Sequence, residues 1–198
     1  MNIVPQEHAA AVADSIVSTI CVRHNGHISS GVIGIQWLMR WLSDAGHGDI
    51  AYRMASADTY PGWGYMVRQG ATTIWELWNG DTASPSMNSG NHVMLLGDLL
   101  PWCYERLGGI RPDIARPGFR HTILQPDFSV NELNGVTAAH PSPYGVISSC
   151  WKRDGGKIVW DVDIPANTTA EAHLPDGRVK RIGSGHYRFA CRNKSSHQ

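Results

Sequence analysis

The hydrophobic period of the sequence changes at about Arg111, and this change constrains the fold more than any other feature. Before it, apolar residues recur every three or four positions, as on one face of a helix. After it, they recur every second position, as on one face of a strand, most clearly in KIVWDVDI at residues 157–164. The sequence therefore predicts a helical region followed by a small antiparallel β domain.

The helical region predicts about five helices. They cover about residues 5–26, 31–46, 49–57 and 91–109, the last kinked or split at Pro101 with Asp98 as a local cap. Asp49 is the expected cap of the third helix. The stretch TYPGWGY, residues 59–65, should break the helix before it, since proline and glycine disfavour helix.

The β region predicts strands joined by short turns. The stretch GVISSCWKR, residues 145–153, runs into KIVWDVDI through DGG, a strong hairpin signal. Further strands are expected in TTAEAHL, in PDGRVKRI and in HYRFAC. RPDIARPGF, residues 111–119, has the composition of a linker. We thus expect a helical region at 1–112, a β domain at 113–192 and a tail at 193–198.

Composition argues against several kinds of partner. The chain has 17 basic and 17 acidic residues and no basic run, so neither nucleic acid nor an anionic membrane surface is an expected partner. No apolar run approaches the roughly 20 residues of a membrane span. The N-terminus lacks the pattern of a signal peptide, which favours a cytoplasmic location. The four cysteines form no CxxC pair, so we expect buried free thiols and neither a metal site nor a cofactor.

Glu76 lies in GATTIWELWNG, residues 70–80, where it is the one carboxylate among two tryptophans and a leucine. Thr73 and Glu76 have the spacing of a capping box, in which both side chains bond the start of a helix. Alternatively, Glu76 is a carboxylate in an aromatic pocket, where burial would raise its pKa toward neutrality and suit acid or base catalysis. The two interpretations are compatible.

Other polar and aromatic residues are weaker candidates. His92 follows Asn88, Ser89 and Asn91, a cluster that either binds hydroxyl groups or simply precedes a helix. His24 and His27 fit an ordinary polar loop better than a metal site. Five of the eight tryptophans fall between Trp37 and Trp78. Trp63 is expected on a loop, while Trp37 and Trp41, at helical spacing, are expected in the core.

Several blocks, in order along nearly the whole chain, resemble bacterial α-L-rhamnosidases of glycoside hydrolase family 78. The blocks are GHISSGVIGIQWLMRWLSDAGHGDIAYRMA, TYPGWGYMVRQGATTIWELWNG, SMNSGNHVMLLGDLLPWCYERLGGI, PGFRHTILQP, SPYGVISSCWKRDGG and IPANTTAEAHLP. The resemblance implies a fold of class α+β: the C-terminal part of an (α/α)6 six-hairpin barrel, followed by a small β-sandwich.

The resemblance also implies a reaction, the inverting hydrolysis of a terminal α-L-rhamnose. Such enzymes use two carboxyl groups about 6.5–9.5 Å apart, one protonating the leaving oxygen and one deprotonating a water. The family's general base carries over to Glu76, and its sugar-contacting histidine carries over to His92. Trp75, Trp78 and Trp63 are expected as walls of the pocket. The ligand would be a rhamnosyl glycoside or rhamnose.

One family feature has no counterpart in the sequence. The family's general acid lies in an acidic block upstream of the matching segments, and this block is absent here. We therefore expect a C-terminal portion of such an enzyme, inactive alone, whose partner is an N-terminal barrel half. Whether it is a split protein, a fragment or a truncated gene product stays open. Alternatives are a non-catalytic carbohydrate-binding remnant and a six-hairpin glycosidase of other sugar specificity.

Overall fold

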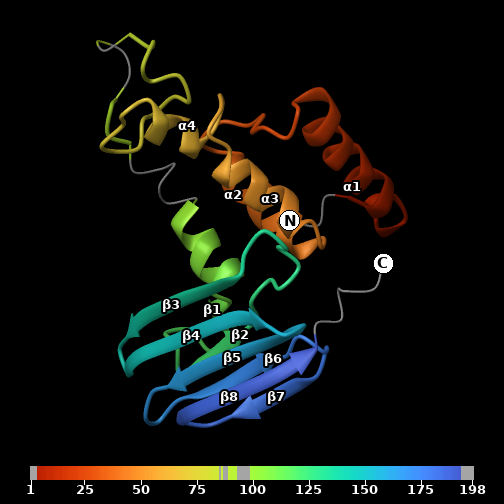
Figure 1. Ribbon diagram of the computed structural model, residues 1–198, viewed down its shortest axis with the longest axis vertical. Coiled ribbons are helices and arrows are strands. Elements are labelled where there is room, and N and C mark those ends of the chain that lie inside the picture. The colour runs from red at the N-terminus through yellow and green to blue at the C-terminus, as the bar shows by residue number, and fades with distance from the viewer. Residues whose placement is uncertain (1–3, 85, 87–88, 93–98, 193–198) are drawn as a thin grey trace. The chain divides into compact units, whose positions relative to one another are not determined.

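A computed structural model describes residues 4–84, 86, 89–92 and 99–192 of the chain (Figure 1). The chain divides into two compact units, residues 1–99 and residues 100–198. The segment 111–119, which reads as a linker, belongs to the second unit, where its first two residues lie in a strand. An isolated β-bridge joins Asp113 to Arg116 in the same segment.

The first unit is helical. It contains η1 (Gln6–His8), α1 (Ala9–Ser18), η2 (Thr19–Arg23), α2 (Ile35–Asp44), α3 (Gly48–Ser56) and α4 (Trp63–Arg68). The first three follow one another without a break, in agreement with the helix predicted over residues 5–26. That run ends where the N–H of Gly26 donates to the carbonyl of Ile20 at 2.8 Å. Gly26 has the left-handed φ of 77° that such helix ends favour.

The apolar face of α2 forms the centre of this unit's core. Ile35, Met39 and Leu42 are fully buried, as their spacing predicts. The prediction of core packing is wrong for Trp37, which is 61% exposed. Trp37 is two residues from Ile35, or about 200° around the helix, so it lies on the opposite face.

Two further predictions for the helical unit need correction. His47, not Asp49, precedes α3, and Asp49 lies in its first turn. Trp63 is not on a loop: it is the first residue of α4 and is buried, 5% exposed. Glycine and proline do end α3, because the helix stops at Ser56 and the next begins only after Gly62.

The predicted helix over residues 91–109 is described only in its second half. Residues 99–102 are α-helical and continue into η3 (Cys103–Leu107), with Pro101 inside the run. Asp98, the predicted local cap, lies outside the described residues. Of the helices that the structure describes, none is both long enough and apolar enough to cross a membrane.

The second unit contains two four-stranded sheets. One has the order β1 (Ile110–Pro112), β2 (His121–Leu124), β6 (Thr169–His173) and β7 (Val179–Ile182). The other has the order β3 (Gly135–Ser142), β4 (Gly145–Asp154), β5 (Lys157–Ile164) and β8 (Gly185–Arg192). Every neighbouring pair is antiparallel except β2 and β6, which are parallel. The unit is therefore the predicted β-sandwich, antiparallel apart from one pair.

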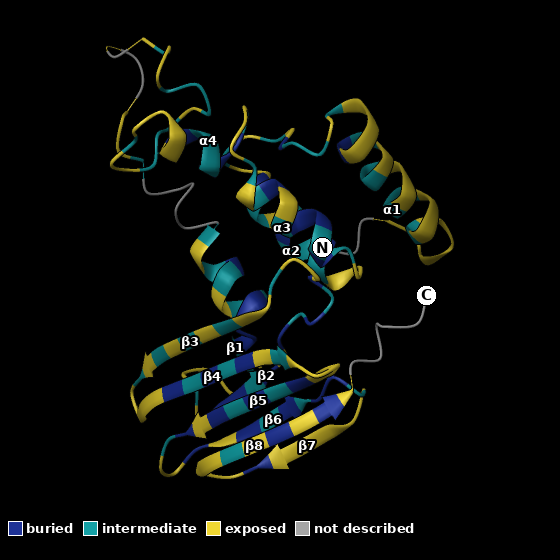
Figure 2. Ribbon diagram, viewed as in Figure 1, coloured by how far each residue is buried: buried dark blue, intermediate teal, exposed yellow. Residues whose placement is uncertain are grey.

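Alternation along the strands produces the core of the β unit. Ile158, Trp160, Val162 and Ile164 of β5 are all buried, as their spacing predicts. Figure 2 shows buried and exposed residues alternating along these strands. The predicted DGG hairpin also forms, with Asp154 opposite Lys157 and positive φ at both intervening glycines, as a two-residue turn of this type requires.

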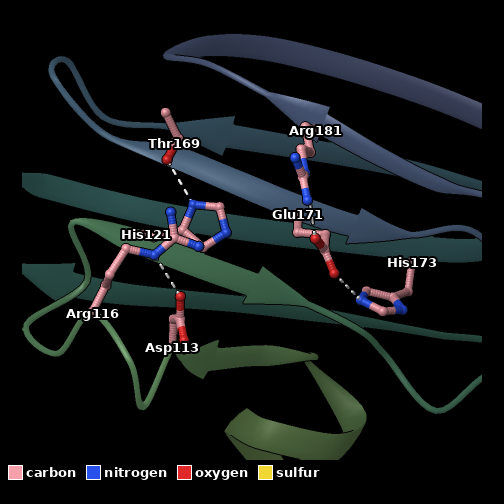
Figure 3. Close-up of polar contacts among 7 residues, drawn as sticks. All are labelled: Asp113, Arg116, His121, Thr169, Glu171, His173 and Arg181. Carbon is pink, nitrogen blue, oxygen red and sulfur yellow. Dashed lines mark hydrogen bonds and ion pairs between the residues drawn. The ribbon is translucent and has the colours of Figure 1, made fainter.

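The outer face of the β1–β2–β6–β7 sheet carries polar side chains that contact one another (Figure 3). The Thr169 hydroxyl lies 2.6 Å from Nδ1 of His121, and Glu171 contacts His173 at 3.0 Å. His121 is 5% exposed, and this burial lowers the pKa of its imidazole from the ordinary 6.5, with the charge of nearby Arg116 acting in the same direction.

The four cysteines are all free thiols. Cys191 is buried and Cys103 and Cys150 are half-buried, but Cys21 is exposed, so the prediction of buried thiols is wrong for Cys21. Burial raises the pKa of the Cys103 thiol.

Candidate functional site

Residues 73–76 and 89–92 lie side by side, held by backbone and side-chain hydrogen bonds. The N–H of Glu76 donates to the carbonyl of Ser89 at 3.0 Å, and the N–H of His92 donates to that of Ile74 at 2.6 Å. The hydroxyl of Thr73 donates to the carbonyl of Gly90 at 2.6 Å. No helix begins at Thr73 in the described chain, so the capping-box prediction is wrong: both side chains bond the neighbouring segment instead.

This pairing brings Glu76 and His92 together. Oε2 of Glu76 accepts a hydrogen bond from the N–H of Ser89 at 2.8 Å and lies 3.9 Å from Nδ1 of His92. The distance to His92 is too long for a hydrogen bond but close enough for charge interaction. Within the described part of the chain, Oε1 of Glu76 has no partner.

The Glu76 side chain is 35% exposed, compared with 20% for His92. The carboxylate is therefore not enclosed by indoles, contrary to the aromatic-pocket interpretation. Oε2 is fixed by the backbone N–H of Ser89, and the side chain as a whole is only partly buried. Such a carboxylate is positioned to accept a proton from water.

A pocket of about 420 Å³, the His92 pocket, lies beside this pair of segments. Its lining residues are Trp63, Met66, Val67, Ala71, Thr72, Thr73, Ile74, Asn91, His92 and Leu99. The wall is mainly apolar, with two threonines, an amide and an imidazole as its polar groups. This combination is common in sites for small organic ligands.

A second pocket of about 660 Å³, the Trp78 pocket, lies in the same unit. It is lined by Arg23, His24, Asn25, His27, Ile28, Ser29, Ser30, Gly31, Tyr60, Pro61 and Trp78. Trp63 of the first pocket meets Trp78 of the second edge-on, with ring centroids 5.1 Å apart at 86°.

The sequence therefore identified residues of both pockets but not their grouping. Trp63 and Trp78 are pocket walls, in different pockets, whereas Trp75 lines neither and its ring lies against Gly80. His24 and His27, which read as an ordinary polar loop, line the Trp78 pocket. The sequence feature that could have indicated this pocket is the polar run with an Asn-Gly turn just before Ser29 and Ser30. Asn88 lies outside the described residues.

No group of three or more metal-ligating side chains occurs among the residues that the structure describes. The geometry thus presents one solvent-accessible carboxylate, one imidazole near it, and two pockets next to the segments that carry them. Known proteins resemble this chain in both sequence and fold.

Residues 1–107 match the bacterial alpha-L-rhamnosidase 6 hairpin glycosidase domain, and residues 109–189 match the bacterial alpha-L-rhamnosidase C-terminal domain. An alpha-L-rhamnosidase of Streptomyces avermitilis is 35% identical over 194 residues, which are 96% of this chain and 18% of that protein. One from Formosa agariphila is 34% identical over 156 residues, 76% of this chain and 16% of its own length.

Solved structures agree. The alpha-L-rhamnosidase from Dictyoglumus thermophilum matches 97% of this chain and 24% of its own, with a TM-score of 0.86 and 27% identity. The Streptomyces avermitilis alpha-L-rhamnosidase, solved with L-rhamnose, matches 96% of this chain and 20% of its own, with a TM-score of 0.85 and 32% identity.

The chain thus spans about a fifth of the length of the relatives it matches, and the two domain models of the family together match most of it. It belongs to the bacterial α-L-rhamnosidase family of six-hairpin glycosidases.

Proposed function

We propose that this chain supplies the general base and part of the sugar site of an inverting α-L-rhamnosidase. Glu76 deprotonates the attacking water through Oε1, while the Ser89 N–H holds Oε2 in place. His92 contacts the rhamnose from the wall of the neighbouring pocket. The observation that carries the proposal is the pairing of the two segments, which brings together the carboxylate and the imidazole that resemble the family's pair.

The reaction also needs a general acid, which we do not assign to a residue of this chain. Inverting hydrolysis needs an acid that protonates the leaving oxygen, about 6.5–9.5 Å from the base. Glu76 is the candidate base, and the upstream barrel segment of a six-hairpin enzyme is the proposed source of the acid. Exposed apolar side chains on the helical unit, among them Val22, Ile33 and Val67, support a partner that covers them.

The test is a chimera in which this chain replaces the matching segment of the Streptomyces avermitilis relative. With p-nitrophenyl α-L-rhamnoside, the chain alone should show no turnover and the chimera should release p-nitrophenol. Glu76→Gln should then lower kcat by about 10²–10⁴-fold, the usual contribution of a general base. Glu7→Gln, an exposed glutamate of the same unit, is the matched control and should change nothing. Turnover by the chain alone, or an unchanged rate in Glu76→Gln, would contradict the proposal.

A non-catalytic carbohydrate-binding role is the second candidate. It is favoured by one observation: Glu76 lines neither the His92 pocket nor the Trp78 pocket. This role predicts that the chain binds rhamnose while the chimera stays inactive even though it folds. The same experiment therefore separates the two functions.

A further inference from the structure

The Trp78 pocket combines flat apolar surfaces with polar groups that have no partner among the described residues. Trp78, Tyr60 and Pro61 provide the apolar part of its wall. The side chains of His24, Asn25 and Ser29 make no hydrogen bond within the described part of the chain. The Ser30 hydroxyl is buried there and is also unpartnered. Buried polar groups normally find partners, so the Ser30 hydroxyl suits a hydroxyl-bearing ligand, to which half-buried His24 and exposed Asn25 and Ser29 could also bond.

The walls of this pocket are fixed by contacts between distant parts of the sequence. The indole N–H of Trp78 donates to the carbonyl of Ser30 at 3.0 Å. His27 contacts the hydroxyl of Thr59 through Nε2 at 2.6 Å and the carbonyl of Asn25 through Nδ1 at 2.9 Å. These bonds tie the loop 24–31 to Thr59 and Trp78, so the pocket is formed before a ligand enters. A preformed pocket spends less binding energy on ordering its own side chains.

The charge of the lining indicates which ligands fit. Arg23 is the one permanently charged residue, and no carboxylate is present among the lining residues. Cations therefore have no counter-charge here, and the lining offers no carboxyl group for the role of the general acid. Neutral hydroxyl-bearing rings fit best, because one face of a pyranose is apolar and stacks on aromatic rings while its hydroxyls need hydrogen bonds.

The position of the pocket relative to Glu76 connects it to the glycosidase site. Residues 72–74 line the His92 pocket and Trp78 lines the other, so Glu76 lies between the two in the chain. We propose that the Trp78 pocket binds a second pyranose unit of the substrate, next to the unit that His92 contacts. This inference rests on the proposed function for the identity of the substrate, but binding can be tested without turnover.

The probe is the disaccharide 6-O-α-L-rhamnopyranosyl-D-glucose, titrated into the full chain and followed by ¹H–¹⁵N NMR. The indole N–H signal of Trp78 and the backbone signals of residues 24–31 should shift together and saturate at millimolar sugar. L-Rhamnose alone should shift the His92 pocket signals more than those of the Trp78 pocket.

Two variants remove one polar group each without disturbing the walls. Asn25→Gly tolerates the left-handed φ of 50° at this position, and Tyr60→Phe keeps the ring. Each should weaken disaccharide binding by about three- to tenfold, the loss expected for one hydrogen bond. Leu77→Ala, an exposed neighbour that lines neither pocket, is the control and should leave the affinity unchanged.

Three outcomes would overturn the inference. They are shifts confined to the His92 pocket, unchanged affinity in both variants, and no shift at tens of millimolar disaccharide. Shifts confined to the His92 pocket would contradict this inference but leave the proposed function intact. An inactive chimera whose Trp78 pocket still binds the disaccharide would contradict the proposed function but not this inference.

Discussion

Gly80→Ala should displace the indole of Trp75 and, with it, the segment that carries Glu76. A Cβ at Gly80 would lie 2.6 Å from two carbon atoms of the Trp75 ring system. Carbon atoms in normal contact are about 3.5–4.0 Å apart, so the ring or the turn at Gly80 must retreat by about 1 Å. Trp75 directly precedes Glu76, so we expect part of this shift to reach the carboxylate. A misplacement of about 1 Å can cost roughly 10²-fold in rate.

The control is Gly90→Ala in the paired segment. A Cβ at Gly90 would meet nothing within 4 Å, although its carbonyl accepts the Thr73 hydroxyl in the same structure. Both variants add one methyl group close to the candidate site, but only Gly80→Ala places it against an indole.

The assay has two readouts. In the chimera, kcat for p-nitrophenyl α-L-rhamnoside should fall by about 10²-fold in Gly80→Ala and by less than about twofold in Gly90→Ala. In the chain alone, hydrogen exchange of the His92 amide, bonded to Ile74, should accelerate in Gly80→Ala only. Equal rates and equal exchange in the two variants would refute the reasoning, because they would mean that the turn at Gly80 absorbs the collision.

Three further predictions concern the stability of the β unit, each measured by hydrogen exchange of its strands. Ser149→Ala removes the acceptor of the fully buried indole N–H of Trp160 and should lower the free energy of unfolding by about 1–3 kcal/mol. A loss below about 0.5 kcal/mol, which is typical of surface substitutions, would contradict the role of this bond. Folding lowers the pKa of His121, so below about pH 6.5 the unfolded chain binds more protons than the folded chain. The free energy of unfolding should therefore fall as the pH drops below that value. His121→Gln should abolish this dependence on pH. Gly109 and Gly118 both have left-handed φ, so the backbone strain of an alanine costs about 1–2 kcal/mol at either position. At Gly109 a Cβ would in addition lie 2.1 Å from the backbone nitrogen of Pro126, so Gly109→Ala should cost more than about 4 kcal/mol in total. Equal losses in the two variants would contradict the collision.

The β unit was the more predictable part of the fold. Its strands carry their own signal, because alternation over residues 157–164 fixes which face is buried and DGG fixes the turn. The parallel pairing of β2 with β6 was not predictable, since these strands are far apart in the sequence and pairing direction leaves no trace in a local pattern. Strands as short as β1, with three residues, also lack enough positions for a period to show.

The site was predictable in its residues but not in its geometry. Family resemblance selected Glu76 and His92, and the structure places Oε2 of one 3.9 Å from Nδ1 of the other. Local spacing gave the wrong conformation at Thr73, because hydrogen bonds to a segment 13–17 residues away replace those of a helix start. The grouping of His24 with Trp78 depends on tertiary contacts, which no local rule expresses.

The most direct test of Glu76 as general base is chemical rescue in the chimera. Glu76→Ala should lose about 10²–10⁴-fold in kcat, because no group remains to deprotonate water. Azide needs no deprotonation and is small enough for the space that the truncation leaves. It should restore much of the rate by attacking the anomeric carbon as p-nitrophenol departs. The product should be β-L-rhamnosyl azide, of inverted configuration. Failure of azide to raise the rate of a folded Glu76→Ala chimera, or an azide product of retained configuration, would contradict the assignment.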